Sequence, residues 1–470
     1  MKTEELNAKI DAYITNSWEQ IVLDIAELVE IPSVEELDKA APEQPFGPGP
    51  AKALRAALAL SDRMGFSPTN CEGYIGFADV SGESDTQFGI IGHMDVVPAG
   101  TGWDFEPFAL TRKDGYLVGR GTIDDKGPTV IALHAIRFLV DHYGGKLPYT
   151  VRFIFGTNEE SGMQDVTYYR QHFADPAFVV TPDADFPVCY GEKGAFDGEI
   201  TSLPLSADAL ILEFEGGMAT NAVPSQASVL LRTSATNLIP TDRITVEAKG
   251  ENTLLVATGI GGHASLPEGT INAIGLLVDY LLENNLCTEE ERAFLELQHA
   301  IISAHDGSGV GIKSSDDAFG ALTLIGGTVK ITSDRRLVQT IDIRYPTSIT
   351  HEEIAATFDA KARQIGAEFE STLSMLPFLI DKDSPIIQAL LAGYNEVTGE
   401  TAEPFTIGGG TYAREFSAGA SFGPGRPWVK DPDWVGSEHS ANEAISEESL
   451  KLALKIYIVT FDKIFTTVTL

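Results

Sequence analysis

One histidine and several carboxylates in this sequence directly follow short apolar runs, where strands of a sheet would end. Residues 92–98 read Gly-His-Met-Asp-Val-Val-Pro and come straight after the apolar run 88–91. His93 and Asp95 are two residues apart, so in an extended backbone their side chains point to the same side. His93 could therefore bind a metal ion through one ring nitrogen while Asp95 accepts a hydrogen bond from the other. For this motif alone, the alternative is a core histidine with a satisfied partner.

A glycine-rich turn carries the next pair of acids. Residues 119–127 read Gly-Arg-Gly-Thr-Ile-Asp-Asp-Lys-Gly, ahead of a helical pattern. Such a turn at a helix N-terminus can bind an anion. Asp124 and Asp125 would repel an anion, so they favour a cation instead. The alternative is an aspartate that only caps the helix.

Two glutamates end a further apolar run. Residues 151–160 read Val-Arg-Phe-Ile-Phe-Gly-Thr-Asn-Glu-Glu. Neighbouring residues at a strand end point in different directions, so one of Glu159 and Glu160 could bind metal while the other acts as a general base towards water. A solvated start of a helix is the alternative.

Two more motifs complete a ligand set. Asp183 follows the run Val-Val-Thr-Pro, and His439 lies between a long Gly/Pro loop and the last helical pattern. Each is unremarkable alone. Together, two histidines and three or four carboxylates at strand or loop ends form the ligand set of a two-metal site with one bridging carboxylate. We expect two divalent ions per chain, zinc before manganese or cobalt, since carboxylate-rich sites accept all three.

The elements that must position these residues alternate along the chain. Apolar, strand-like runs at 88–92, 149–156 and 177–181 are separated by helical patterns at 127–142 and 164–172. This alternation is typical of an α/β domain with a mostly parallel sheet covered by helices.

The pattern changes after about residue 190, where runs typical of antiparallel strands predominate, and the α/β pattern returns at about residue 384. We therefore expect a catalytic domain in two parts, residues 1–190 and 384–470. Between them lies an inserted α+β lid domain, residues 191–383.

Composition excludes several classes of partner. The 470 residues include 33 Lys and Arg against 68 Asp and Glu, a net charge of −35. Nucleic acid and anionic membranes require a basic surface, and the sequence has no basic cluster. The polar start is unlike a signal peptide, and no run of about 18 apolar residues occurs. With three widely spaced cysteines, interpreted as reduced thiols, these features predict a cytoplasmic protein.

The motifs resemble a known metal signature. Gly-His-Met-Asp-Val-Val-Pro, Gly-Arg-Gly-x-x-Asp-Asp-Lys-Gly, Gly-Thr-Asn-Glu-Glu and Thr-Pro-Asp-Ala-Asp are similar to the motifs of the co-catalytic two-metal metallopeptidase family of aminoacylase, carboxypeptidase G and desuccinylase. The resemblance covers nearly the whole chain. Asp-Asp-Lys-Gly-Pro at 124–128 and Ile-Gly-Gly-Gly-Thr-Tyr-Ala-Arg at 407–414 are most similar to the PepV-type dipeptidases, which cleave Xaa-His or β-Ala-Xaa dipeptides.

The resemblance assigns a role to each ligand. It implies that Asp124 bridges both metals, that His93 and Asp183 complete one site, and that Glu160 and His439 complete the other.

The resemblance also implies that Glu159 is the general base and acid of the reaction. Asp95 would hold the His93 ring in place, and the Asp124–Asp125 peptide bond would be cis.

Substrate contacts from the lid domain are implied as well. His263 would help to stabilise the oxyanion, and Asn221 and Arg344 would bind the C-terminal carboxylate of the substrate. Strand alternation places Asp342 and Arg344 on one face of the strand, where Arg344 is free to bind the substrate. The alternative is that Asp342 and Arg344 only pair with each other at the surface. Gly408, Gly409 and Gly410 would let the backbone approach the substrate closely, with substrate contacts expected at Gly409, Gly410 and Thr411.

The expected activity is metal-dependent hydrolysis of unmodified dipeptides, with a broad specificity that could extend to β-Ala or D-residue dipeptides. One alternative is an N-acyl amino acid amidohydrolase, a deacylase or desuccinylase of the same family. A second is a catalytically dead metal- or peptide-binding protein. The large insertion favours a monomer over a homodimer. The chain departs from the family at Asp185, where close relatives often have Glu, a position outside the expected ligands. A long proline-rich loop at 417–438, just before His439, is a second departure that could alter substrate preference.

Overall fold

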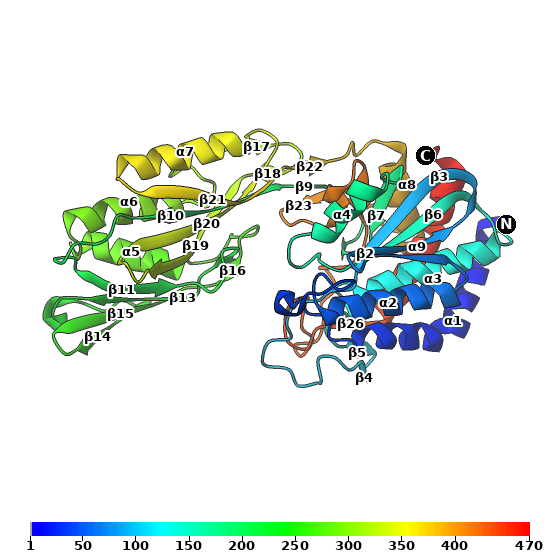
Figure 1. Cartoon of the computed structure of the whole chain (residues 1–470), viewed down its shortest axis with the longest axis horizontal. Coiled ribbons are helices and arrows are strands. Elements are labelled where there is room, and N and C mark those ends of the chain that lie inside the picture. The colour runs from blue at the N-terminus through cyan, green and yellow to red at the C-terminus, as the bar shows by residue number, and fades with distance from the viewer. Residues whose placement is uncertain (1) are drawn as a thin grey trace. The chain divides into compact units, whose positions relative to one another are not determined.

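The chain forms two compact units in the computed structural model, which describes residues 2–470 (Figure 1). The first unit contains the residues up to Tyr190, Leu379–Phe405 and Gly410–Leu470. The second contains Gly191–Phe378 and Thr406–Gly409. The second unit ends at residue 378, five residues before the expected boundary, and it also includes a short segment from the C-terminal part of the chain. This segment belongs there because the Ile407 carbonyl accepts the Lys193 N–H at 2.9 Å.

A mixed sheet forms the centre of the first unit. Its central strands run parallel in the order β6-β3-β7-β24, while β1 and β2 pair antiparallel at one edge and β9 pairs antiparallel with β24 at the other. The expected α/β fold with a parallel sheet is thus confirmed for the strands that carry the candidate ligands. The strands are β1 (Ser67–Cys71), β2 (Ile75–Val80), β3 (Gly82–His93), β6 (Leu147–Gly156), β7 (Phe178–Thr181), β9 (Cys189–Glu192) and β24 (Gly419–Ser421).

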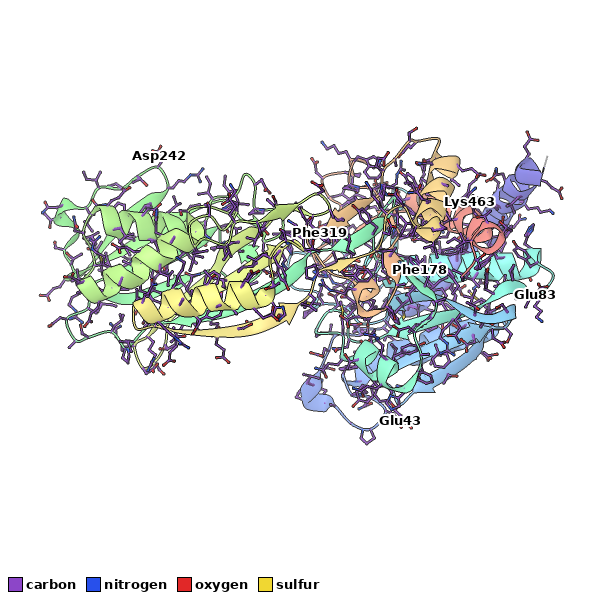
Figure 2. The ribbon with its side chains drawn as sticks, turned by 90° about the horizontal axis from the view of Figure 1, so that it is seen from above. Glu43, Glu83, Phe178, Asp242, Phe319 and Lys463 are labelled. Atoms are coloured by element: carbon purple, nitrogen blue, oxygen red, sulfur yellow. The ribbon has the colours of Figure 1, made fainter. Side chains whose placement is uncertain are left out.

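Helices cover both faces of this sheet because alternate strand residues point to opposite sides. In β3, Ile90 belongs to the larger core and Ile91 to a smaller one, and both are fully buried. Phe178, labelled in Figure 2, begins β7 on the larger-core side and is 4% exposed. The larger core is built with α1 (Lys2–Val29), α2 (Pro48–Arg63), α3 (Lys126–His142), α8 (Pro385–Thr398) and α9 (Glu447–Thr467); the smaller one with α4 (Gln164–His172) and η3 (Tyr412–Glu415).

A small three-stranded sheet joins the C-terminal segment to the glycine-rich turn. It contains β4 (Thr111–Lys113), β5 (Tyr116–Val118) and β26 (Ala444–Ser446), and β26 pairs antiparallel with β5 (Figure 1). Consequently the chain just after β5, which carries Asp124, lies beside the chain just before β26, which carries His439.

The proline-rich loop differs from the expectation. Residues Gly419–Ser421 were expected in an irregular loop at 417–438, but they form β24 inside the central sheet, parallel to β7. Their buried side chains are small, so a strand fits there without a long apolar run. Trp434, later in the loop, packs edge-on against Tyr116 at 5.5 Å and lies under the Lys113 ammonium at 4.2 Å.

The second unit is an antiparallel sheet with helices on one face. Its strand order is β14-β15-β13-β11-β19-β20-β10-β21, and α5, α6 and α7 build its core. Side-chain caps begin each helix: Asn272 for α5, and Thr288 and Thr350 in capping boxes for α6 and α7. This matches the α+β character expected of the inserted domain.

The elements of the second unit have the following bounds. The main strands are β10 (Gly194–Thr201), β11 (Ile211–Gly216), β13 (Gln226–Leu231), β14 (Ile244–Lys249), β15 (Asn252–Thr258), β19 (Thr323–Ile331), β20 (Leu337–Tyr345) and β21 (Glu368–Met375). The helices are η2 (Ala235–Asn237), α5 (Ala273–Glu283), α6 (Glu289–Ile302) and α7 (His351–Gln364). Two short pairs are β12 (Ala222–Val223) with β16 (Gly262–His263) and β17 (Ser315–Asp316) with β18 (Gly320–Ala321).

The remaining short elements are η1 (Leu37–Lys39), β8 (Ala184–Asp185), β22 (Phe378–Leu379), β23 (Phe405–Ile407) and β25 (Pro424–Gly425). Among the described residues, no helix combines the length and the apolar character needed to cross a bilayer.

Candidate metal centre

The candidate ligands meet at one edge of the central sheet of the first unit. His93 is the last residue of β3, Glu159 and Glu160 follow β6, and Asp183 follows β7. The carboxyl ends of parallel strands point the same way, which is why ligand sites in α/β sheets form there. Asp124 joins them from the turn before α3. His439 joins from the loop before β26.

The two carboxylate oxygens of Asp124 face two different histidines. Oδ1 lies 2.7 Å from His93 Nε2, and Oδ2 lies 2.9 Å from His439 Nε2. The same His439 nitrogen is 2.9 Å from Glu160 Oε2, and His93 Nε2 is 3.8 Å from Asp183 Oδ2. Asp124 therefore stands between a His93–Asp183 group and a His439–Glu160 group, the division implied by the family resemblance.

Glu159 lies among the candidate ligands. Ligand-type atoms of His93, Glu159 and Asp183 all lie within 4.8 Å of one another, as do those of His93, Asp124 and Glu160. By position alone, Glu159 could bind metal or act on a water next to it.

Asp95 holds the His93 ring mainly through its backbone. His93 Nδ1 is 2.9 Å from the Asp95 carbonyl oxygen and 3.5 Å from its carboxylate Oδ1. Both atoms are acceptors, so Nδ1 carries the proton and Nε2 is left to face Asp124. The Asp95 carboxylate Oδ2 instead accepts the Glu160 N–H at 3.1 Å, so Asp95 also positions the second glutamate, a contact that the sequence did not indicate.

Asp125 does not join the cluster as a ligand. The Asp124–Asp125 peptide bond is cis, as expected. The Asp125 carboxylate Oδ2 accepts the His93 backbone N–H at 3.2 Å and the Thr129 hydroxyl at 2.9 Å. It therefore anchors the start of α3 to the end of β3.

Burial and mutual repulsion disfavour the ionised form of the carboxylates in this cluster when no cation compensates their charge. Burial and then the charge of Asp124 raise the pKa of Asp183 to about 7. Burial and then the charge of Asp183 raise the pKa of Glu159 well above its ordinary value. Burial likewise raises the pKa of Glu160. Nearby cations favour the ionised forms, so this donor set fits a pair of divalent ions.

Two of the expected substrate-binding residues lie side by side in the second unit. β12 pairs antiparallel with β16 so that Ala222 is opposite His263, and the Asn221 carbonyl accepts the Ala264 N–H at 2.9 Å. The Ser265 backbone N–H donates to His263 Nδ1 at 3.2 Å. Since Nδ1 is an acceptor there, Nε2 of the neutral ring carries the proton and is a donor.

Arg344 is paired with Asp342, as in the alternative from the sequence, but the pair is largely buried and not at the surface that the alternative assumed. Its Nε and Nη2 donate to the two carboxylate oxygens of Asp342 at 2.9 and 2.7 Å. Nη1 lies 3.5 Å from the Gly408 carbonyl oxygen. A guanidinium has five N–H donors, so the Nη1–Nη2 edge still presents hydrogens to a second carboxylate. Asp342, almost wholly buried, fixes the plane of the fork.

The Gly408 region lies beside the His263 segment within the second unit. A Cβ on Gly408 would stand 2.6 Å from the Ser265 Cβ, so only glycine allows this approach. The three other expected backbone contacts are divided between the units: Gly409 in the second, Gly410 and Thr411 in the first. Thr411 is buried, and its hydroxyl interacts with Ser421 Oγ at 2.9 Å and accepts the Ala413 N–H.

Asp165 is a supporting residue that the sequence analysis missed. Its buried carboxylate accepts the backbone N–H groups of Thr157 and Asn158 at 2.6 and 3.1 Å, and the Tyr412 hydroxyl donates to the same oxygen. These bonds hold the segment that leads to Glu159. The available signal was an acid in the first turn of a predicted helix, which usually indicates only an interaction with the helix dipole.

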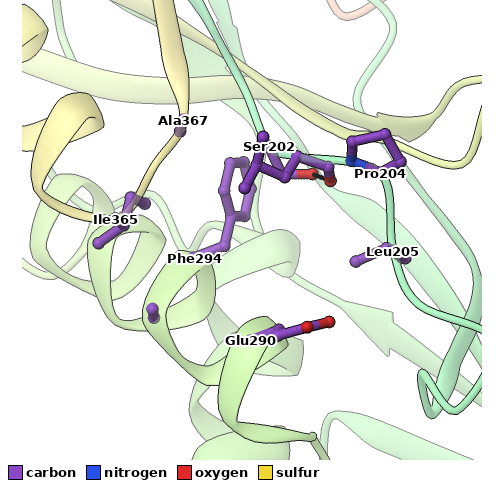
Figure 3. Close-up of a pocket in the computed structure, with 9 residues that line it drawn as sticks. Ser202, Pro204, Leu205, Glu290, Phe294, Ile365 and Ala367 are labelled. Atoms are coloured by element: carbon purple, nitrogen blue, oxygen red, sulfur yellow. Dashed lines mark hydrogen bonds between the residues drawn. The ribbon is translucent and has the colours of Figure 1, made fainter.

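A cavity in the second unit carries no comparable chemistry. It has a volume of about 180 Å³ and lies between α6 and the segments that follow β10 and α7 (Figure 3). Its walls are mostly apolar, and Glu290 is its one ionisable lining residue.

The fold and site together define an α/β metallohydrolase, because two histidines and several carboxylates converge at the carboxyl edge of a parallel sheet. Residues 89–463 match peptidase family M20/M25/M40, and the chain belongs to this family.

Comparisons with individual proteins agree with this membership. The chain is 32% identical over 458 residues to a Staphylococcus epidermidis protein named "Putative dipeptidase", covering 93% of this chain and 96% of that one. It is 32% identical over 455 residues to "Putative dipeptidase YtjP" of Bacillus subtilis, with 93% and 96% covered. The crystal structure of human carnosine dipeptidase 1 has a similar fold, with a TM-score of 0.58, 16% identity, and 98% and 99% of the two chains covered.

Proposed function

We propose that this peptidase is a two-metal dipeptidase that hydrolyses unmodified dipeptides. The observation that carries the proposal is the position of Asp124, whose two oxygens face His93 on one side and His439 on the other. A carboxylate shared in this way is the expected bridge of a two-metal site. The relatives at 32% identity carry the name "Putative dipeptidase", and a similar fold occurs in human carnosine dipeptidase 1.

In the proposed site, His93 and Asp183 hold one ion, Glu160 and His439 hold the other, and Asp124 holds both. Divalent ions held by these residues would supply Lewis-acid activation of the attacking water and of the scissile carbonyl. Zinc suits this donor set, and manganese and cobalt suit it as well.

Glu159 is the proposed base and acid. Its carboxylate lies within 4.8 Å of ligand atoms of His93 and Asp183, where it can accept a proton from the attacking water. The same group can then protonate the amine that leaves, as general acid–base catalysis requires.

Residues of the second unit have proposed roles in binding. The Nε2–H of His263 donates to the oxyanion that forms at the scissile carbonyl. Arg344, oriented by Asp342, and Asn221 bind the C-terminal carboxylate of the substrate. Recognition of this carboxylate favours substrates whose scissile bond is the last one of the peptide.

A substrate panel tests the proposal. Protein stripped with a chelator is supplied separately with zinc, manganese or cobalt and offered Leu-Leu, β-Ala-His, an N-acetyl amino acid and a tripeptide. Metal-dependent cleavage confined to the two dipeptides is the expected result. Cleavage of the N-acetyl compound alone would assign the protein to the N-acyl amino acid amidohydrolases, and no cleavage of any compound would contradict an enzymatic role.

Arg344→Ala is expected to raise KM for free dipeptides by about 10- to 100-fold, because a charge-assisted hydrogen-bonded contact contributes about 1.5–3 kcal/mol. C-terminally amidated dipeptides should be affected much less. The measurement is KM for matched free and amidated substrates.

Arg336→Ala is the control for loss of an arginine, since Arg336 pairs with the exposed Asp334 near the start of β20. It should leave KM unchanged. An equal loss on free and amidated substrates in Arg344→Ala would contradict a carboxylate-binding role.

A further inference from the structure

Glu443 lies at the centre of the turn that carries Asp124. Its side chain is 0% exposed. Oε1 accepts three backbone N–H groups, from Gly121 at 2.9 Å, Ile123 at 3.0 Å and Asp124 at 3.3 Å. One carboxylate oxygen thus accepts hydrogen bonds from backbone N–H groups of the turn that would otherwise have no partner.

The rest of the turn also bonds to Glu443. Its Oε2 accepts Nη1 of the buried Arg120 at 2.5 Å. Its carbonyl oxygen accepts the Gly119 N–H at 2.9 Å, while the Thr122 hydroxyl donates to the Gly119 carbonyl at 2.8 Å and lies 3.4 Å from the Glu443 carbonyl oxygen. Five of the six residues from 119 to 124, all but Thr122, therefore donate a hydrogen bond to this one residue.

Strand pairing explains the position of Glu443. β26 pairs antiparallel with β5 so that Ala444 is opposite Val118 (Figure 1). Glu443 precedes β26 and Gly119 follows β5, so the two come together where the pairing ends. Gly121 then adopts a φ of +95°, a left-handed conformation that glycine adopts without strain, and this lets the turn fold around the carboxylate.

The two sequence neighbours of Glu443 close the loop that carries His439. The Gly436 N–H donates to the Asn442 carbonyl at 2.9 Å, and the Ala444 N–H donates to the Gly436 carbonyl at 3.2 Å. These two bonds form the base of the loop on either side of Glu443. The tip of the loop is more exposed, since the His439 side chain is 53% exposed. The hydrogen bonds at the base of the loop must therefore fix the direction in which the tip points.

We infer that Glu443 is a positioning residue that fixes the Asp124 turn and the His439 loop relative to each other before any metal binds. The inference rests on the proposed metal centre, but it concerns a residue outside the proposed ligands and substrate-binding residues. Partners that orient metal ligands typically account for a 10- to 100-fold difference in metal affinity.

Hydrogen exchange of the metal-free wild-type protein provides the first test. The amides of Gly121 and Ile123 should exchange at least about 100-fold more slowly than amides of the exposed segment 99–102, because they remain bonded to Glu443 without metal. Exchange at the rate of that segment would overturn the inference, since the metal would then organise the turn.

Glu443→Gln provides the second test. It keeps one acceptor oxygen but removes the charge that pairs with Arg120. Competition with a chromogenic chelator should show zinc affinity about 10- to 100-fold weaker for at least one of the two ions. If this variant does not fold, the exchange measurement on the wild type decides the question.

Glu447→Gln is the matched control. Glu447 begins α9, binds Arg112 and the Trp18 indole, and has no hydrogen bond to residues 119–124 among those the structure describes. It should leave zinc affinity unchanged. All four tryptophans lie in the first unit, so their fluorescence reports whether that unit is folded in each variant.

The outcomes separate this inference from the proposed function. A wild-type protein that binds no metal would contradict the proposed metal centre itself. A wild type with two ions and a folded Glu443→Gln variant of equal zinc affinity would overturn only the role of Glu443, because a purely structural pair would change stability and not affinity.

Discussion

Glu159→Gln is expected to lower kcat for a dipeptide by about 10²- to 10⁴-fold while the protein still binds two metal ions. Glutamine keeps the size and polarity of the side chain but cannot take a proton from water, and general acid–base catalysis contributes an effect of this size. Steady-state kinetics and the metal content of the same desalted sample are the two measurements.

Metal content decides between the two roles that the position of Glu159 allows. If the variant loses an ion, Glu159 is a ligand, in keeping with its place within 4.8 Å of His93 and Asp183. If it keeps both ions and most of its activity, another group is the base. Glu403→Gln, at an exposed position of the first unit, is the control for a change of charge.

Asp124→Asn should have the largest effect on metal content. Asp124 faces both histidines, so both ions lose a shared negative charge at once. We expect fewer than two ions per chain at micromolar zinc and activity reduced to background. His439→Ala should weaken one ion more than the other, because its ring contacts only the Asp124–Glu160 side of the cluster.

Asp185→Asn is the matched control for Asp124→Asn. Asp185 is an acid two residues beyond the proposed ligand Asp183, and burial raises its pKa to about 6, but it is not part of either candidate ligand group. The variant should keep two ions. Two bound ions in Asp124→Asn would contradict a bridging role.

The meeting of the proposed ligands in one cluster could be predicted because a local pattern marks the position of most of them. An apolar run that ends in His93, or in Glu159 and Glu160, defines both a buried strand and its carboxyl end. Parallel strands then bring these ends to one edge without any further information. The same logic identified α3 and β6 to within a few residues.

Contacts between distant segments could not be predicted. Nothing near Glu443 in the sequence indicates that it accepts three amides of a turn more than three hundred residues earlier. Strand alternation correctly placed Asp342 and Arg344 on one face, but it could not decide whether they pair. β24 was missed because three small residues give no apolar signal, although the neighbouring β7 buries them.

The order of the strands has a consequence for how the protein is made on the ribosome. β24 pairs with β7, and His439 lies opposite Asp124, yet the whole second unit is translated between these partners. The second unit is nearly contiguous in the sequence, so it can fold as soon as it emerges from the ribosome. The first unit must wait until its last segment is synthesised, because its strand pairings join residues far apart in the chain. A newly made chain therefore contains five of the six proposed ligand and base residues before the sixth, His439, is synthesised, so metal capture by the proposed centre would be a late event of biosynthesis.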